Sequence, residues 1–313
     1  MKKMFMAVIA LMMTISASAQ FYIYFSNGTV AKVDSISMIA PGEPEEPDTP
    51  TEPEEPTNPS AGIGVFSVSA DKQVTFSKGN LQYTQSTNTW SFAENQWDYI
   101  GTDNVTGGSV SSDSTYCDDK YGTALADKVD LFGWGTGDAP TKSSTSYSDY
   151  STFVDWGTNK IGNDAPNTWR TLTYDEWKYL LNTRPNASSI KGVAQVNGVN
   201  GLILLPDNWI CSAGITFKSG FHSEWGVDYY AAYQTFTADQ WSILEAAGAV
   251  FLPAAGGRCG ASVSNVQDCG YYWSATESDS SHARYLLFHS DAAYMNFILR
   301  YYGRSVRLVK DLQ

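Results

Sequence analysis

A regular proline repeat divides the chain into two parts. Prolines occupy every third position from Pro41 to Pro59, in a segment that also holds six Glu, one Asp and no Lys or Arg. Polyproline II has three residues per turn, so the rings share one edge, while the carboxylates repel one another and extend the segment. Residues 41–60 then reach about 60 Å at roughly 3.1 Å per residue. We predict an extended linker here; a proline-motif ligand for another domain is the alternative.

The residues before this linker resemble an export signal. Lys2 and Lys3 precede an apolar run that ends in Ala17-Ser18-Ala19, the small-residue pattern of a signal peptidase site. The run is shorter than the about 20 residues that span a bilayer, and no later segment is long and apolar enough to span one. We therefore predict a signal peptide at residues 1–19 and a protein that is secreted or at the cell surface.

Residues 20–40 are predicted to form a short β segment. Two β-like runs flank Asn27-Gly28, a dipeptide typical of hairpin turns. Either the two runs pair with each other, or residues 21–39 pair with a strand of a neighbouring molecule.

The net charge bears on which partners the chain can bind, and the cysteines bear on which disulfides it can form. The net charge is -13, and no basic stripe exists that would neutralise phosphates, so nucleic acid is not an expected partner. Four cysteines, Cys117, Cys211, Cys259 and Cys269, form no CxxC pair and allow two disulfides in three connectivities in an exported chain.

Residues 61–313 are predicted to form one folded domain. Period-2 alternation over residues 64–100 predicts three or four strands, and the Gly-, Ser-, Thr- and Asp-rich residues 101–165 predict long loops. Two capping boxes predict helices, with Thr173 and Glu176 in the first and Thr237 and Gln240 in the second. Their apolar faces are Trp177, Leu180 and Leu181, and Trp241, Leu244 and Ala247, with Gly248 as the second stop. Residues 198–209 and 249–258 predict buried strands. The fold class predicted is α+β, with two helices packed on short, mostly antiparallel strands.

Catalytic motifs are absent from the sequence. Gly133 to Gly137 resembles a nucleotide loop, but Asp138-Ala139-Pro140 follows where a helix would have to begin. Asp279, His282, His289 and Asp291 are metal-ligand types without ordered spacing. We predict no enzyme, no cofactor and no metal. The alternative is an enzyme with a loop-built site around Glu224 and Asp228, the acidic pair that capping does not explain.

The C-terminal third predicts a binding surface. Six of the nineteen tyrosines lie in residues 270–304. Leu286 and Phe288 alternate with Tyr285, Leu287 and His289, so one strand face is core-like and the other is chemically mixed. Strand propensity alone also favours tyrosine, but a mixed Tyr-rich face is typical of a paratope. Within residues 258–304 the predicted ligand-binding residues are Tyr271, Arg284, Tyr285, Leu287, His289, Asp291, Tyr294, Phe297, Leu299, Tyr301, Tyr302 and Arg304.

Several short motifs resemble a known set of exported bacterial proteins. They are residues 80–83 (NLQY), 95–101 (NQWDYIG), 130–137 (DLFGWGTG), 168–172 (TWRTL), 204–209 (LLPDNW), 251–258 (FLPAAGGR), 270–274 (GYYWS) and 305–309 (SVRLV). About residues 63–310 thereby resemble the major paralogous domain family first described from Fibrobacter, most specifically in their C-terminal third. This resemblance implies a C-type lectin-like fold, shared with formylglycine-generating enzymes.

The C-terminal stretch is also similar to the variable proteins of diversity-generating retroelements. That resemblance implies a diversified, adhesin- or receptor-like protein that binds a protein or glycan ligand. The calcium-dependent sugar motifs of true lectins and the reactive cysteine pair of formylglycine-generating enzymes are absent. A structural or assembly subunit of a surface structure is the alternative function.

Overall fold

The computed structural model describes residues 21–24, 30–33, 64–106, 109–110, 125–210 and 215–312. The chain divides into two units, Met1–Glu55 and Pro56–Gln313. In the first, β1 (Phe21–Tyr24) pairs antiparallel with β2 (Val30–Val33), with Tyr24 opposite Val30. The two runs thus pair with each other, and Asn27-Gly28 lies in their connection. The predicted signal peptide and linker lie outside the described residues.

Strands dominate the second unit, and the predicted α+β, C-type lectin-like fold is wrong. Apart from the β1–β2 pair, the strands of the described residues form five small sheets. The α-helices among these residues are three short ones, α1 (Tyr174–Lys178), α2 (Asp228–Tyr233) and α3 (Ala238–Ala246). A capping box marks where a helix begins but does not fix its length, and the two predicted helices are too short to form a layer.

A four-stranded sheet lies under α3. Its order is β11 (Thr235–Phe236), β9 (Lys191–Val196), β10 (Val199–Leu204) and β12 (Val250–Pro253). The β9–β10 hairpin turns at Asn197 and Gly198, which both have positive φ (48° and 81°), as a type I′ turn requires. β10 and β12 are the two buried strands expected from the sequence.

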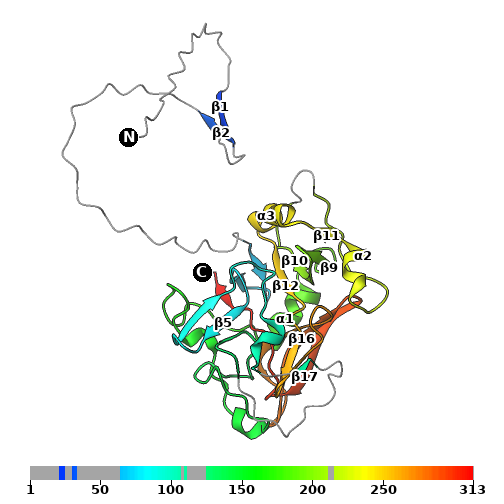
Figure 1. Ribbon diagram of the computed structural model, residues 1–313. Helices are drawn as coiled ribbons and strands as arrows, with labels where there is room; N and C mark the ends of the chain where they lie inside the picture. The colour runs from blue at the N-terminus through cyan, green and yellow to red at the C-terminus, as the bar shows by residue number, and fades with distance from the viewer. Residues whose placement is uncertain are drawn as a thin grey trace, which may run out of the picture. The chain divides into compact units, whose positions relative to one another are not determined.

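The longest strands form a separate three-stranded antiparallel sheet. β15 (Gly270–Glu277) pairs with β16 (His282–His289), which pairs with β17 (Ala292–Leu299). Ser290 and Asp291 connect β16 and β17, because His289 is paired with Ala292. Figure 1 shows this hairpin in orange and red, with α2 near one of its ends.

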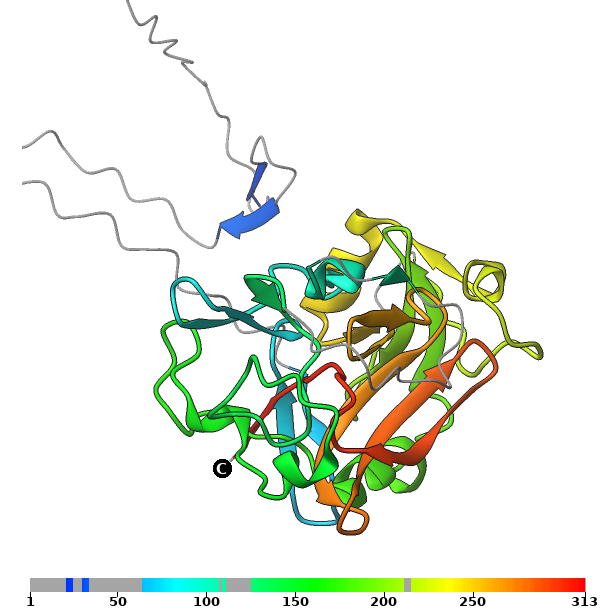
Figure 2. The ribbon, with the colours of Figure 1, turned by 60° about the horizontal axis from the view of Figure 1, so that its bottom comes forward.

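Three smaller sheets complete the unit (Figure 2). In the first, β4 (Gln73–Phe76) lies between β3 (Phe66–Ser67) and β18 (Val309–Asp311). In the second, β5 (Leu81–Thr84) lies between β6 (Thr89–Phe92) and β8 (Lys128–Val129). In the third, β14 (Ser262–Ser264) lies between β13 (Gly257–Cys259) and β7 (Ser109–Val110). Three or four strands were expected in residues 64–100, and the structure has four, β3 to β6.

Loops with short 3₁₀ turns fill much of residues 101–165, as expected for the part that the structure describes. The turns are Gly101–Asn104, Tyr147–Tyr150 and Trp156–Thr158.

Three apolar clusters separate these layers. Trp241 and Leu244 of α3 pack on Ile203 and Phe251, on one face of the four-stranded sheet. The other face of that sheet packs against the Leu286 and Phe288 face of the three-stranded sheet. A third cluster covers the opposite face of the three-stranded sheet with Leu81, Trp90, Phe132, Trp134 and Trp156. β15 and β16 are therefore mostly buried between these clusters, whereas the residues of β17 are half-buried or exposed.

Both predicted capping boxes are confirmed. Thr173 accepts from the Glu176 N–H, Thr237 accepts from the Gln240 N–H, and each N3 side chain returns to its N-cap N–H. Residues Tyr179–Thr183 continue α1 as a π turn that buries Leu180 and Leu181. Gly248 ends α3 with φ 94°, but Ala247 is exposed rather than part of the apolar face.

Two further properties of the described residues are the length and apolar character of their helices and the state of two cysteines. Among the described residues, no helix has the length and apolar character needed to cross a membrane. Cys259 is disulfide-bonded, whereas Cys269 is a buried free thiol, so these two cysteines do not pair with each other.

Candidate functional site

The mixed face of β16 is covered by protein for most of its length. Tyr285 and Leu287 are only 4% and 9% exposed, because they belong to a buried apolar cluster that also contains Trp134 and Trp156. Leu286 and Phe288, the predicted core positions on the other face, are confirmed as buried, since both are 0% exposed. The expectation of an open face at Tyr285 and Leu287 is therefore wrong.

One accessible part of the predicted site lies at the β16–β17 turn, where Tyr294 is 42% exposed. Trp225 is 58% exposed, yet its ring is stacked on His289 with centroids 4.8 Å apart. Its indole Nε1 also donates a 3.0 Å hydrogen bond to Asp268 Oδ1. An exposed tryptophan that is held by two contacts presents its free face with little loss of side-chain entropy on binding.

Ser290 fixes the loop that carries Trp225. Its hydroxyl donates to the Glu224 carbonyl at 2.8 Å and accepts from the Gly226 N–H at 3.0 Å. The Ser290 carbonyl accepts from the His222 N–H at 2.8 Å. The loop and the hairpin turn thus form one connected element.

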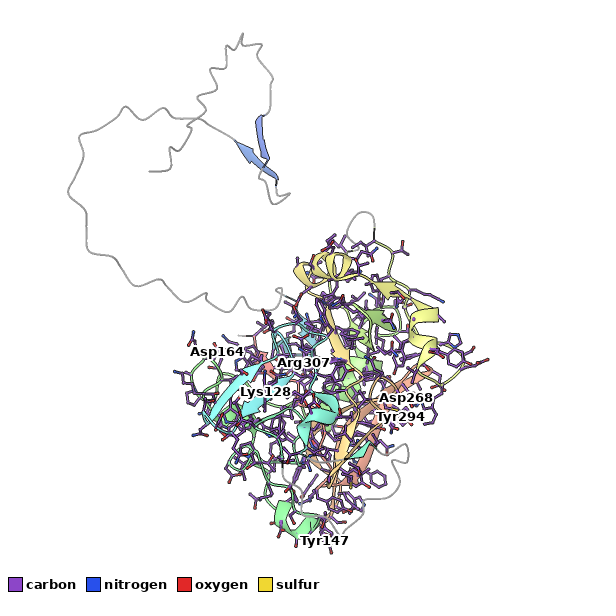
Figure 3. All side chains as sticks on the ribbon, viewed as in Figure 1. Lys128, Tyr147, Asp164, Asp268, Tyr294 and Arg307 are labelled. Carbon is purple, nitrogen blue, oxygen red and sulfur yellow. The ribbon has the colours of Figure 1, made fainter. Side chains whose placement is uncertain are left out.

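Acidic and aromatic side chains surround the Trp225–His289 stack. His289 Nδ1 contacts Asp291 Oδ1, and the His289 ring meets Tyr294 edge-on at 5.8 Å. Burial raises the pKa of Asp268, which the Trp225 hydrogen bond and the nearby His289 partly offset. Tyr294 is 42% exposed, and Figure 3 labels both Asp268 and Tyr294. We call Trp225, His289, Asp268, Asp291 and Tyr294 the turn surface.

A buried arginine with tyrosine neighbours continues this region inward. The Arg304 guanidinium lies 3.8 Å from the Tyr271 ring centroid, 5.2 Å from that of Tyr302 and 5.3 Å from that of Tyr285. Arg304 and Asp291 both act electrostatically on the Cys269 thiol. The turn surface and the Arg304 cluster are therefore neighbours across Cys269.

The remaining predicted residues are divided between the other end of the hairpin and the third cluster. Arg284 lies between the rings of Tyr174 and Phe297, at 5.1 and 5.3 Å. Phe297 is exposed, while Leu299 and Tyr301 pack against the third cluster. The structure thus brings His289, Asp291 and Tyr294 together at one end and leaves Arg284 and Phe297 at the other.

The geometry offers no metal site among the described residues. His282 pairs with Asp279 at 2.9 Å and His289 contacts Asp291. These two histidines are the first and last residues of β16, and at about 3.3 Å per residue they are too far apart to share an ion.

Both members of the acidic pair, Glu224 and Asp228, act electrostatically on the Tyr229 hydroxyl. Both side chains are exposed. Asp228 is the first residue of α2, and Glu224 acts on the Tyr229 hydroxyl, whose pKa it raises by hydrogen bonding.

Sequence reasoning gave Trp225 no binding role and did not anticipate the burial of Arg304. The only signal for Trp225 was its place between an acidic residue and a glycine in a loop, and its contacts to His289 and Asp268 cross more than forty positions of sequence. Comparisons with protein-family models, curated proteins and solved structures find no match for this chain. The family resemblance drawn from the short motifs stays a prediction.

Proposed function

We propose that this protein is a ligand-binding protein and that the turn surface contacts the ligand. The observation that supports this most directly is Trp225, whose large ring is exposed and yet held by His289 and Asp268. Tryptophan and tyrosine contribute most strongly to recognition when they are rigid and surrounded by polar groups. Tyr294 and the carboxylates of Asp268 and Asp291 supply that surrounding.

The ligand we propose is a protein or a glycan. The turn surface combines apolar ring faces with carboxylate acceptors, which suits partners that carry both apolar surface and hydrogen-bond donors. The signal-like N-terminus favours binding outside the cell, in a protein that is secreted or at the cell surface.

The test is binding of the full chain to glycan and protein arrays. Trp225→Ala and Tyr294→Ala should each weaken binding to the best array ligand by about tenfold or more, the range of interface hot spots. Tyr147→Ala is the matched control, since Tyr147 is also an exposed aromatic, at 47%, but belongs to a separate 3₁₀ turn. Equal binding by all three variants would refute a binding role for the turn surface.

A second candidate function is assembly through an exposed sheet edge. β17 is the last strand of its sheet, and its sequence AAYMNFIL holds no charged residue and no proline. Such an edge is suited to pairing with a strand of another molecule. Phe297→Lys should abolish self-association measured by analytical ultracentrifugation; a wild-type chain that stays monomeric at all concentrations would eliminate this candidate.

A further inference from the structure

Arg304 is a buried cation that the fold leaves without a hydrogen-bond acceptor. The residue is 5% exposed, and its backbone is fixed by two 2.9 Å hydrogen bonds with Phe132. Its Nη1 lies against Gly257, where an added Cβ would come within 1.8 Å. Its position is therefore defined by packing on three sides.

Within the described residues, the Arg304 guanidinium makes no hydrogen bond and no ion pair, and Nε is fully buried without a partner. The other buried arginines of this unit differ. Arg300 and Arg307 donate to backbone carbonyls, and Arg184 is paired with Asp207 at 3.0 Å. A buried charge without acceptors is costly, and tyrosine rings compensate only part of that cost.

The aromatic neighbours of Arg304 are tyrosines, whose hydroxyls can donate as well as accept hydrogen bonds. The Tyr285 hydroxyl forms no hydrogen bond to any described residue, although the ring lies beside the guanidinium. Neither this hydroxyl nor the terminal Arg304 nitrogens are among the fully buried atoms that lack a partner, so they retain contact with solvent. The guanidinium fork lies 5.3 Å from the Tyr285 ring, and the fork and the phenol together form a donor set for an oxyanion.

We propose that Arg304 binds an anionic oxygen group of the ligand, either a carboxylate or a sulfate. This inference rests on the proposed function, because the rest of the ligand would lie over the adjacent turn surface. The small exposure of Arg304 admits one such group rather than a whole ligand. Asp268 and Asp291 repel further negative charge, so the group is a single anion on an otherwise neutral molecule.

The experiment observes the arginine side chains of the full chain directly. In protein labelled with ¹⁵N arginine, the Nε–Hε resonance of Arg304 is assigned by its loss in Arg304→Gln. D-glucuronate supplies a carboxylate on a sugar ring, glucose 6-sulfate supplies a sulfate, and glucose is the neutral control, all at matched ionic strength. We expect a saturable shift of this resonance with glucuronate, with the sulfate, or with both, and no shift with glucose.

Two variants separate a binding role from a structural one. Arg284→Gln removes an arginine that packs on Tyr174 and Phe297, so the anion response of Arg304 should persist. Arg304→Lys keeps the charge but loses the planar fork, so its affinity for the bound anion, glucuronate or glucose 6-sulfate, should be at least tenfold weaker than that of wild type. This variant tests the site even if Arg304→Gln fails to fold.

Each result decides between the two proposals. Absence of a saturable Arg304 shift with either anion, or binding by Arg304→Lys that equals wild type, overturns the anion site. If Trp225→Ala still loses array binding in that case, the proposed function stands and only the anion inference fails. If Arg304 responds to the anion while the Trp225 and Tyr294 variants bind the arrays normally, the turn surface is refuted and the anion site stands.

Discussion

Single residues connect the C-terminal strands to the loops that cover them. Arg300 donates to the carbonyls of Tyr150 and Ser151 and lies 4.5 Å from the Trp134 ring. Arg307 donates to the carbonyls of Ser77 and Phe251. Complete burial lowers the pKa of Arg307 to about 10, so it is still charged at neutral pH. These guanidinium groups donate to carbonyls of the loop around Tyr150, of the residue after β4 and of β12, which would otherwise be buried with fewer donors.

Asp130 should make stability depend on pH. It is fully buried and accepts from the Asn104 side chain at 2.7 Å and the Ile100 N–H at 2.8 Å. Burial outweighs these bonds and raises its pKa from 3.8 to about 6. The folded state therefore favours the protonated acid, and the stability due to this group is full below pH 3.8 and is lost as pH rises through about 6.

The measurement compares wild type with Asp130→Asn by urea unfolding between pH 4 and pH 7.5. The free energy of unfolding of wild type relative to this variant should fall by about 2–3 kcal/mol over that range, at 1.36 kcal/mol per pKa unit. If the difference in free energy of unfolding between wild type and Asp130→Asn did not change with pH, the raised pKa of Asp130 would be contradicted.

At the scale of elements, the first turn of α1 connects the helix to other parts of the chain. Glu176 is N3 of the capping box and also accepts from Arg170 at 2.7 and 2.9 Å. Arg170 in turn binds Asp311 of β18 at 2.7 Å. A helix of five residues cannot be stable alone, so these contacts join it to the sheet that contains β18.

Glu176→Gln should therefore destabilise the protein by about 2 kcal/mol at pH 7, the scale of a hydrogen bond to a charged group. Burial alone would raise the pKa of Glu176, but hydrogen bonds from Arg170 and the Thr173 N–H lower it overall. Its contribution is thus present above pH 4.5 and is lost as pH falls through the lower folded value. Thermal unfolding at pH 7 and pH 3 measures both effects.

Asp175→Asn is the control for this prediction. Asp175 lies in the same turn but is exposed, and its interaction with the helix dipole is worth only about 0.5 kcal/mol. If the two variants lost equal stability at pH 7, the Arg170–Glu176 contact would have no special role.

Local signals in the sequence predicted elements but not their surroundings. Thr173 and Glu176 specify a helix start through contacts three residues apart, so the sequence alone sufficed. The alternation around Leu286 correctly separated two strand faces. It could not show that Trp134 and Trp156, more than a hundred positions away, cover the face of Tyr285 and Leu287. The same non-local packing hid the burial of Arg304 and the role of Trp225.

At the scale of the whole molecule, the three-stranded sheet lies between two apolar clusters. Leu286 and Leu287 therefore test the architecture from opposite faces of one strand. Leu286→Ala and Leu287→Ala should each lower the free energy of unfolding by about 2–5 kcal/mol in urea titrations. An effect of Leu287→Ala within about 0.5 kcal/mol, as for a surface site, would mean that its face is open after all.

The C-terminal strand closes the second unit. β18 pairs with β4 near the start of this unit, and Val309 exchanges two 2.9 Å backbone hydrogen bonds with Arg170. Val309 itself is fully buried, and Asp311 binds the Arg170 side chain.

Removal of residues 309–313 would expose the β4 edge, leave Arg170 paired only with Glu176 and open the core beside Phe76. Because each loss affects contacts between distant parts of the chain, we expect the truncated protein to unfold at least 10 °C below wild type, which corresponds to about 2.5–5 kcal/mol for a unit of this size. Lys310→Ala, which removes an exposed side chain and keeps the strand, should change the midpoint by less than about 2 °C. Differential scanning calorimetry of the three proteins decides the matter, since a truncated chain that melts with wild type would show that β18 is dispensable for closing the fold.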